Sequence, residues 1–211
     1  MRINNHKGES QIVPCGKCNF CLQNRRNQWA FRLHYELKRA KSAVFVTLTY
    51  NNESVPVKII GTRPFLILDK DELQNFHKVL KQYQSRLLLR KKIKDRKDWK
   101  IKYYSVGEYG STYDRPHYHC ILYNLHPLVK EKLELNQIWT KGSIFFGTVE
   151  DASIQYVAKY VIDREAEEDL RTRPFAHMSK GLGSNYIEKR ADYHKKTKTF
   201  YVMKDGFKQA M

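Results

Sequence analysis

Two histidines separated by a single residue, His117 and His119, have the spacing in this sequence that most directly suggests chemistry. They lie in DRPHYHCILYN (114–124), which otherwise has the pattern of a buried strand. Side chains two residues apart in a strand point to the same face, so both imidazoles would face one point while Tyr118 and Cys120 face the other way. Such a pair can hold a metal ion. Taken alone it is more often a coincidence, so the interpretation depends on the rest of the chain.

Glu108 is the candidate for a third ligand. It ends a predicted strand (99–110) that a short connection through Asp114 and Pro116 joins to the histidine strand. Antiparallel pairing of the two strands would carry this carboxylate beside the imidazoles. A mixed histidine and carboxylate site with open positions suits Mg²⁺ or Mn²⁺ acting as a Lewis acid on phosphate.

A helix predicted over 151–164 offers a candidate reacting group. Its apolar face consists of four aliphatic residues, Ile154, Val157, Ala158 and Val161. Tyr156 and Tyr160 fall on the side away from this face, one turn apart, with Lys159 beside them. A phenol, with an ordinary pKa of about 10, becomes a competent nucleophile when a metal polarises the phosphate and positive charge favours the phenolate.

Three of the four cysteines form a second cluster, Cys15, Cys18 and Cys21, in PCGKCNFC. The N-terminal residues contain no apolar signal segment, so adjacent CxxC steps favour metal thiolates over disulfides, with zinc as the default. The candidates for the fourth ligand are His6, His34, Cys120 and a residue of another chain. The alternative is three reduced, packed thiols, and an iron–sulfur site would need a convincing fourth cysteine.

The charge of the chain points to a polyanionic partner. Lysine and arginine number 39 against 22 acidic residues, and the formal charge of +17 is spread along the 211 residues. A folded domain with such a surface attracts nucleic acid, although charge that serves solubility alone is the alternative. No run of eighteen apolar residues occurs, so we expect no membrane-spanning helix.

The pattern of apolar residues predicts the elements that must position these groups. The predicted strands are 43–52, 99–110, 114–124 and 142–150. The predicted helices are 24–41, 68–92, 126–139 and 151–164. The second begins with Asp69 as N-cap and Glu72 three residues on, a capping-box pattern. The segments 53–67 and 173–190 are predicted loops. The order is that of the α+β, split βαβ or ferredoxin-like plan, with an antiparallel sheet, helices on one face and the other face free for a site.

Three motifs in order carry a family resemblance: FVTLTY (45–50), GEYGSTYDRPHYHCILY (107–123) and YVAKYV (156–161). They resemble the motifs of HUH endonucleases, named for histidine, a bulky hydrophobic residue and histidine. The resemblance is strongest to the rolling-circle replication initiators of the Microviridae, in particular the gokushovirus-like group. PCGKCNFC…QWAFR and FAHMSKGLGSNYI also resemble that group, so the likeness covers nearly the whole chain. The group usually runs on past a segment like YVMKDGFKQAM, so this chain is expected to be a truncated nuclease portion.

The resemblance implies an HUH nuclease core over 43–164, with the tyrosine helix beside the metal-binding strand. A metal-binding knuckle and basic helix (1–42) would precede the core, and a basic extension (165–211) would pack on it. In this family the metal ligands would be His117, His119 and Glu108, and the paired nucleophiles Tyr156 and Tyr160. Thr47 and Thr49 belong to the first motif, whose role is less well defined and partly structural. The zinc-like cluster departs from a complete site, because no fourth ligand is evident.

The implied reaction is the nicking of single-stranded viral origin DNA, with a 5′-phosphotyrosine intermediate, a free 3′-OH and later rejoining. Candidate DNA contacts are Arg25, Arg26, Arg32, Arg115 and Lys180. The implied partners are single-stranded or hairpin origin DNA and the host replication helicase and polymerase, in the cytoplasm of a bacterial host. Two rival functions remain open: an HUH transposase or relaxase, and a non-catalytic, zinc-stabilised nucleic-acid-binding protein.

Overall fold

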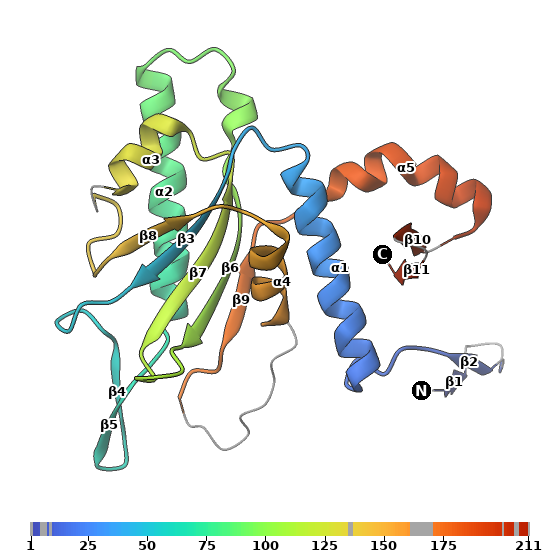
Figure 1. Ribbon diagram of the computed structural model, residues 1–211, viewed down its shortest axis with the longest axis horizontal. Coiled ribbons are helices and arrows are strands. Elements are labelled where there is room, and N and C mark those ends of the chain that lie inside the picture. The colour runs from blue at the N-terminus through green and yellow to red at the C-terminus, as the bar shows by residue number, and fades with distance from the viewer. Residues whose placement is uncertain are drawn as a thin grey trace.

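The computed structural model describes the chain except residues 1, 5–7, 9, 135–136, 161–170, 200, 205–206 and 211. Its centre is a five-stranded antiparallel sheet in the order β8-β3-β7-β6-β9 (Figure 1). These strands are β3 (Ala43–Thr49), β6 (Lys102–Tyr109), β7 (Pro116–Tyr123), β8 (Ile144–Gly147) and β9 (Phe175–Met178). The helices are α1 (Asn19–Leu37), α2 (Lys70–Arg90), α3 (Pro127–Glu134), α4 (Asp151–Lys159) and α5 (Ser184–Thr197). The predicted α+β class is confirmed.

The remaining described elements are small and lie outside the central sheet. They are the two-stranded pairs β1 (Arg2–Asn4) with β2 (Ser10–Ile12), β4 (Val57–Ile60) with β5 (Arg63–Leu66), and β10 (Tyr201–Lys204) with β11 (Phe207–Ala210), and the 3₁₀-helix η1 (Arg96–Trp99). No described helix is long and apolar enough to cross a membrane.

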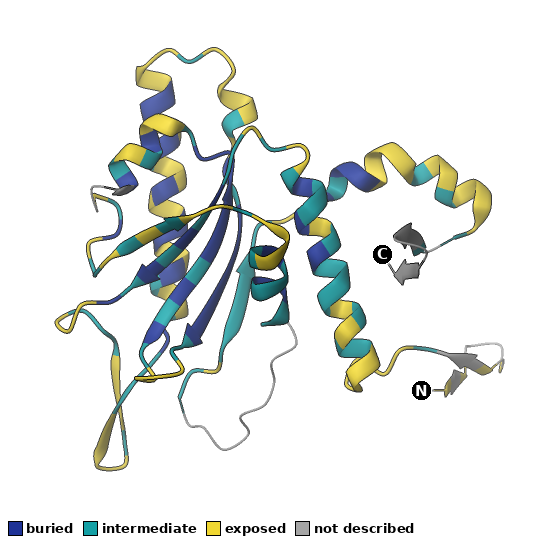
Figure 2. Cartoon of the chain, viewed as in Figure 1, coloured by how far each residue is buried: buried dark blue, intermediate teal, exposed yellow. Residues whose placement is uncertain are grey.

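Helices cover both faces of the sheet, so the prediction that they lie on one face is wrong. On one face, Val46 and Leu48 of β3 and Cys120 of β7 pack in a core with α2 and α3. On the other face, strand residues such as Ile121 pack in a second core with α1 and α4. The central strands β6 and β7 are largely buried between these two layers, whereas the edge strands β8 and β9 are partly exposed (Figure 2). The physical reason is that α1 and α4 each carry an apolar stripe that also needs a partner.

Tyr118, the residue between the two histidines, determines which face of β7 points toward α2 and which points toward α4. Its side chain is fully buried on the α2 side. Its hydroxyl donates to the carbonyl of Asp69 (2.7 Å), accepts from the Asp69 amide (3.0 Å) and lies 2.8 Å from the Tyr50 hydroxyl. Because strand side chains alternate, this anchor turns His117 and His119 toward α4.

Asp69 is the N-cap of α2, as predicted, with its side chain accepting from the amides of Asp71 (2.8 Å) and Glu72 (3.0 Å). The predicted capping box, however, is not formed. The Glu72 carboxylate is engaged by Tyr50 and Lys141 instead of turning back to the N-cap amide, which donates to the Tyr118 hydroxyl. Tertiary contacts therefore replace the local bond that the sequence pattern suggested.

The four predicted strands of the core and the helices beside them are confirmed, with ends that differ by a few residues; positions 161–164 of the last predicted helix lie outside the described residues. Two predicted loops contain further structure. The segment 53–67 forms the β4–β5 hairpin, and the segment 173–190 contains β9 and the first half of α5. The four residues of β9 are too few to show strand periodicity, and their pairing with β6 specifies them. The domain limits at 42 and 164 stay a prediction, although β9 adds a strand from beyond 164 to the sheet.

Candidate metal site and tyrosine pair

The register of β6, β7 and β3 brings the candidate ligands together on the face that α4 covers. Glu108 pairs directly with His117, as the antiparallel arrangement predicted. Thr47 pairs with His119 from the other side of β7. Alternation along each strand then places all four side chains on one face, next to the side of α4 that carries Tyr156.

The three candidate ligands converge on one oxygen. The Oε1 atom of Glu108 lies 2.9 Å from Nε2 of His117 and 2.8 Å from Nε2 of His119. All three ligand atoms lie within 4.8 Å of one another. Ligands at right angles around an ion with bonds of about 2.1 Å are about 3.0 Å apart, so the groups need to move little to hold Mg²⁺ or Mn²⁺. The residues fit a divalent ion.

The second nitrogen of each imidazole has its own partner. Nδ1 of His117 donates to the carbonyl of Arg115 (3.1 Å), and Nδ1 of His119 lies 2.9 Å from the Thr47 hydroxyl. Such outer contacts fix the tautomer and the orientation of a metal-binding histidine. The ring of Phe45 stacks on His119, with ring centroids 5.4 Å apart. Sequence reasoning left Thr47 without a defined role and missed Phe45, although alternation along 43–49 already places both on one strand face.

The electrostatics keep Glu108 ionised. Burial alone would raise its pKa, but hydrogen bonds from His117, His119 and Tyr156 outweigh burial and lower the pKa to about 2. For His117, burial has the opposite effect and lowers the pKa of the imidazole. Its hydrogen bonds to Glu108 and to the Arg115 carbonyl outweigh burial, so the pKa of His117 lies above its ordinary value. A carboxylate with so low a pKa holds its charge for a cation and is a weak acceptor of protons.

Tyr156 and Tyr160 lie at the edge of this cluster. The Tyr156 hydroxyl donates to Oε1 of Glu108, and the Tyr160 hydroxyl donates to that of Tyr156 (3.3 Å). Burial, together with the bond to Glu108, raises the pKa of Tyr156 above its ordinary value. Nζ of Lys159 lies over both phenol rings, at 4.3 and 4.7 Å from their centroids.

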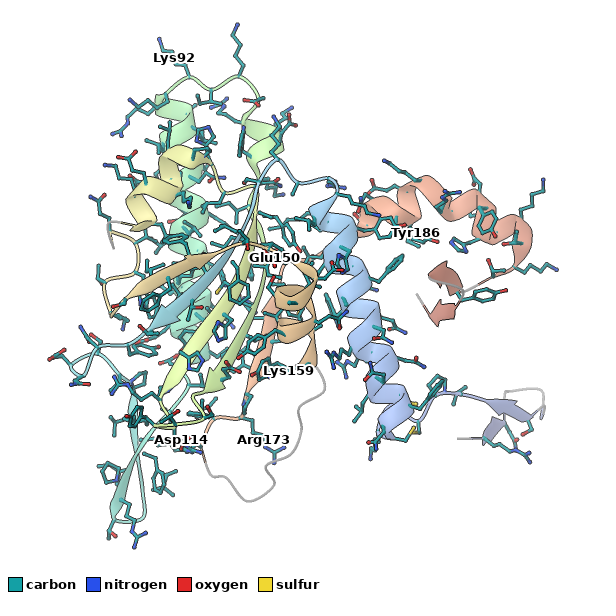
Figure 3. All side chains as sticks on the ribbon, in the orientation of Figure 1. Lys92, Asp114, Glu150, Lys159, Arg173 and Tyr186 are labelled. Atoms are coloured by element: carbon teal, nitrogen blue, oxygen red, sulfur yellow. The ribbon has the colours of Figure 1, made fainter. Side chains whose placement is uncertain are left out.

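Helix α4 presents these groups because its opposite face is anchored. Ile154, Val157 and Ala158 are buried, as predicted, whereas Val161 lies outside the described residues. The Glu150 side chain and Ser153 form a capping box at the start of the helix. Figure 3 shows Glu150 and Lys159 at the two ends of α4.

Replacing Thr47 by valine is expected to weaken Mn²⁺ binding by roughly 10- to 100-fold, the range found when an outer-shell partner of a metal ligand is lost. Valine keeps the shape of the side chain but leaves Nδ1 of His119 without its partner. Titration of Mn²⁺ followed by electron paramagnetic resonance measures the affinity. The matched control is Thr49→Val on the same strand face, because the Thr49 hydroxyl bonds to the Ser143 carbonyl (3.3 Å) instead of a histidine. Equal losses in the two variants would contradict the orienting role of Thr47.

The cysteine cluster has the spacing of a thiolate metal site. The sulfurs of Cys15 and Cys21 lie 3.7 Å apart, and two thiolates on a tetrahedral zinc with bonds of about 2.3 Å are about 3.8 Å apart. Amides of Lys17 and Cys18 donate to Cys15 and lower the pKa of its thiol to about 6. The thiolate form that binds metal is thereby favoured.

Two of the candidates for the fourth ligand are wrong. Cys120 is fully buried in the core on the α2 side, and Nε2 of His34 lies 3.4 Å from Asp151 on α4. Within the described part of the chain, no histidine or carboxylate joins the three sulfurs. His6 lies outside the described residues, so His6 and a residue of another chain remain open.

Purified protein is expected to contain about one zinc per chain, lost on Cys15→Ser. Loss of a structural zinc couples to folding, and a cost of about 2–3 kcal/mol would lower Tm by roughly 5–10 °C in a chain of this size. Elemental analysis and a thermal melt measure both effects. Cys120→Ala is the control, because it removes a thiol outside the cluster and should keep the zinc. If the wild type contains no zinc and melts at the same temperature as Cys15→Ser, the three cysteines are packed thiols instead of a metal site.

The candidate DNA-contacting residues are not brought together by the structure. The Arg115 guanidinium donates to Asn52 (3.1 Å) and to the Tyr50 carbonyl (3.1 Å), so it ties the β6–β7 loop to the end of β3. On α1, Arg32 lies over the ring of Trp29. Lys180 is exposed beyond β9. Their role in DNA binding stays a prediction.

Taken together, the fold and the site define an α+β protein with a candidate histidine–carboxylate metal site and adjacent tyrosines. The family described as replication-associated protein ORF2 matches residues 43–165, more than half of the chain. The chain therefore belongs to this family, which confirms the family resemblance of its three motifs.

Relatives come from several bacterial viruses. The replication-associated protein VP4 of Bdellovibrio phage phiMH2K is 29% identical, over 93% of this chain and 64% of its own length. The replication-associated protein ORF2 of Spiroplasma virus 4 is 30% identical, over 83% of this chain and 57% of its own length. The replication-associated protein ORF4 of Chlamydia phage 1 is 27% identical, over 93% of this chain and 50% of its own length. The chain thus spans between half and two thirds of the length of these relatives.

Among solved structures, the chain is similar to the N-terminal nuclease domain of non-structural protein 1 of minute virus of mice. The identity is 12%, over 78% of this chain and 81% of that one, and the TM-score is 0.26. A score this low carries no argument about fold or function.

Proposed function

We propose that this protein is a replication initiator that nicks single-stranded viral origin DNA through a tyrosine, with the help of a divalent metal ion. The observation that carries the proposal is the bond from the Tyr156 hydroxyl to Glu108, the carboxylate that His117 and His119 also contact. A candidate nucleophile thus lies directly beside a candidate metal site. Membership of a replication-associated family makes DNA the natural substrate.

The fold that we assign is the HUH nuclease fold on a ferredoxin-like plan. Strands β3 and β6 are parallel to each other with β7 between them, and β7 and β8 are parallel with β3 between them. With α2 and α3 as the connections, these are two interleaved split βαβ units. The additional strand β9 and helices α1, α4 and α5 surround this core.

In the proposed reaction, the phenol oxygen of a tyrosine attacks the scissile phosphorus and the bond to the 3′-oxygen breaks. The phenol proton passes to solvent, the leaving 3′-oxygen takes up a proton, and the 5′-phosphate stays on the tyrosine. His117, His119 and Glu108 would hold Mg²⁺ or Mn²⁺, which supplies positive charge at the phosphate. Lys159, above both rings, favours the phenolate.

Two tyrosines within hydrogen-bonding distance suit a strand-exchange reaction. While one phenol holds the 5′-phosphate of the first cut, the other can attack the next origin. The energy of the phosphodiester bond is kept in the phosphotyrosine, so the free 3′-OH can prime synthesis and the strand can be rejoined. The host helicase and polymerase, in the cytoplasm of the bacterial host, would then be the partners of this step.

Each of the two rival functions accounts less well for the residues of this site. A non-catalytic, zinc-stabilised nucleic-acid-binding protein accounts for the charge and the cysteines but gives no reason for tyrosines bonded to the ligand cluster. An HUH transposase or relaxase tends to have one catalytic tyrosine or a third metal-binding histidine. The described residues place two tyrosines and two histidines here.

A cleavage assay on a randomised pool of single-stranded oligonucleotides tests the proposal. With Mn²⁺ we expect a DNA–protein adduct that resists denaturing electrophoresis, and sequencing of the cut ends should give a preferred site. EDTA should prevent the adduct, and relaxed duplex DNA should give little. A pool that is bound but never cut would favour the non-catalytic rival.

A further inference from the structure

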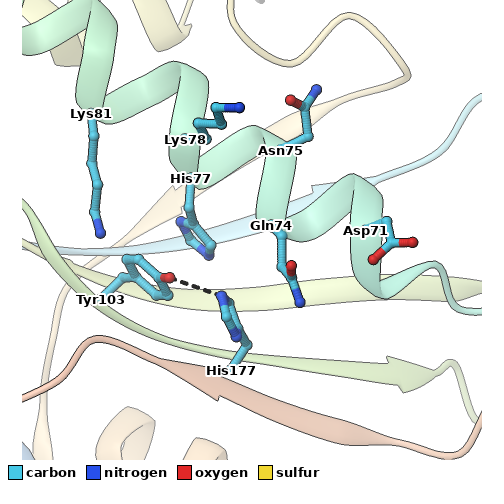
Figure 4. Close-up of a pocket in the computed structure, with 8 residues that line it drawn as sticks. All are labelled: Asp71, Gln74, Asn75, His77, Lys78, Lys81, Tyr103 and His177. Carbon is cyan, nitrogen blue, oxygen red and sulfur yellow. Dashed lines mark hydrogen bonds between the residues drawn. The ribbon is translucent and has the colours of Figure 1, made fainter.

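A cavity of about 500 Å³ lies on the opposite side of the sheet from the tyrosines, between α2 and the strands β6 and β9 (Figure 4). Lys78 and Lys81 of α2, Tyr103 of β6 and His177 of β9 line it. Tyr103 belongs to the core on the α2 side, whereas Glu108, an odd number of residues further along β6, faces α4. The cavity is therefore separate from the candidate metal site.

The polar wall of this cavity is held rigidly. The rings of His77 and Tyr103 stack at 3.6 Å, and the Tyr103 hydroxyl lies 2.8 Å from Nε2 of His177. His77 is 2% exposed and its Nε2 lies 2.9 Å from the Ser105 hydroxyl, while its Nδ1 has no hydrogen-bond partner among the described residues. The proposed function uses none of these groups.

A second cavity of about 580 Å³ continues the first along α2, because Lys81 lines both. It is bounded by the C-terminal half of α2 and by the segment around η1, and its lining includes Arg96, Lys97, Trp99 and Lys100. The two cavities adjoin at Lys81, and together we call them the α2 groove; the α2 residues that line it run from Asp71 to Leu89. At 1.5 Å per helical residue this is about 27 Å.

The α2 groove has an excess of positive charge, because five cations and one carboxylate, Asp71, line it. Among the described residues, no carboxylate forms an ion pair with its five cations, Lys78, Lys81, Arg96, Lys97 and Lys100. Burial, and then the charge of Lys100, lowers the pKa of Lys81. Burial, and then the charges of Lys70 and Lys81, lowers the pKa of His177. A bound anion would relieve this repulsion.

The remaining lining groups suit a nucleotide strand better than a simple anion. Trp99 lines the recess and is only partly buried, whereas Tyr103 is buried beneath His77 and Lys81 and braces the wall. The exposed amides of Gln74 and Asn75 can bond to base edges. We propose that the α2 groove binds a second segment of single-stranded DNA, away from the cleavage site. Its length suits about four nucleotides, the lower end of single-strand site sizes. The choice of DNA rests on the proposed function.

Salt dependence of binding is the first test, with a fluorescent 30-residue oligothymidylate as the probe. The groove variant carries Lys→Gln at 78, 81, 97 and 100, and the control carries Lys→Gln at 189, 195, 196 and 198, four exposed lysines on or beside α5. The slope of log K against log salt is negative, and each lost phosphate contact reduces its magnitude by about 0.7, so we expect that magnitude to fall by about 2–3 in the groove variant. In the control, the magnitude of the slope should change by less than the value of one contact, about 0.7. No difference between the variants overturns the proposal.

Thermal melts establish that both variants are folded. If the fourfold groove variant does not fold, the pair Lys97→Gln and Lys100→Gln, whose side chains are exposed, should give about half the fall in the magnitude of the slope. An unchanged slope in this pair overturns the proposal.

Photo-crosslinking locates the strand directly. An oligonucleotide containing 5-bromodeoxyuridine should crosslink to peptides that contain Trp99 or the exposed groove residues Gln74 and Asn75. Thymidine monophosphate serves as a competitor. If it binds tightly and blocks these crosslinks, and if the groove variant keeps its affinity for the oligonucleotide, then the groove is a site for a free nucleotide. That result would overturn the proposal that it binds a DNA strand. A wild type that crosslinks here without forming a tyrosine adduct would contradict the proposed nicking alone. An adduct with no crosslink at these residues would contradict the groove alone.

Discussion

Replacing Tyr156 and Tyr160 together by phenylalanine is expected to abolish the covalent protein–DNA adduct, with a loss of at least about a thousandfold, as when a nucleophile is removed from a covalent mechanism. Phenylalanine keeps the ring that packs beside His119 and below Lys159. It removes only the two oxygens that can attack phosphorus. Denaturing electrophoresis with a labelled oligonucleotide measures the adduct, and anisotropy should show that DNA binding is largely kept.

The single variants separate the two phenols. Tyr156→Phe and Tyr160→Phe should each leave one nucleophile, so each should form an adduct, weakened or confined to the remaining tyrosine. Tyr193→Phe, a half-exposed tyrosine of α5, is the matched control and should leave the adduct unchanged. An adduct in the double variant at the wild-type level would contradict the mechanism.

The second large effect is expected from His117→Ala, which removes one of the three candidate ligands. Cleavage should fall by at least about a hundredfold, more than the loss of an outer-shell partner, because Mn²⁺ binding itself is lost. Oligonucleotide affinity should fall little, since phosphate contacts with lysine and arginine dominate it. Electron paramagnetic resonance measures bound Mn²⁺, and anisotropy measures bound DNA.

His126→Ala is the control for this experiment. His126 lies in the loop before α3 and contacts the ring of Trp99 instead of the ligand cluster. It should keep full Mn²⁺ binding. A His117→Ala variant that binds Mn²⁺ as the wild type does would show that the ion sits elsewhere and would refute the ligand assignment.

The ligand cluster is predictable from the sequence because short-range rules determine it. Alternation puts His117 and His119 on one strand face, and a tight connection to the preceding strand forces antiparallel pairing with Glu108. The position of Tyr156 away from the apolar face of α4 follows equally from helical periodicity. Each of these inferences spans only a few residues or one connection.

Other features depend on contacts between distant segments, which no local pattern encodes. The coverage of the second sheet face by α1 and α4 and the edge strand β9 are examples. The bond between Thr47 and His119 spans 72 positions and requires the order of strands to be known. The α2 groove likewise joins lysines of one helix to His177, which arrives on β9. Burial and pairing of this kind become visible only in three dimensions.

Mapping the adduct by mass spectrometry shows whether a tyrosine beside the His117, His119 and Glu108 cluster attacks DNA. Trypsin cleaves after Lys159, so it places Tyr156 in the peptide 142–159 and Tyr160 in the peptide 160–164. After Mn²⁺-dependent cleavage and nuclease trimming, we expect a phosphonucleotide on the tyrosine of one or both peptides, and none when EDTA is present. A phosphonucleotide on any other residue, or cleaved DNA with both peptides unmodified, would contradict the proposed attack by tyrosine.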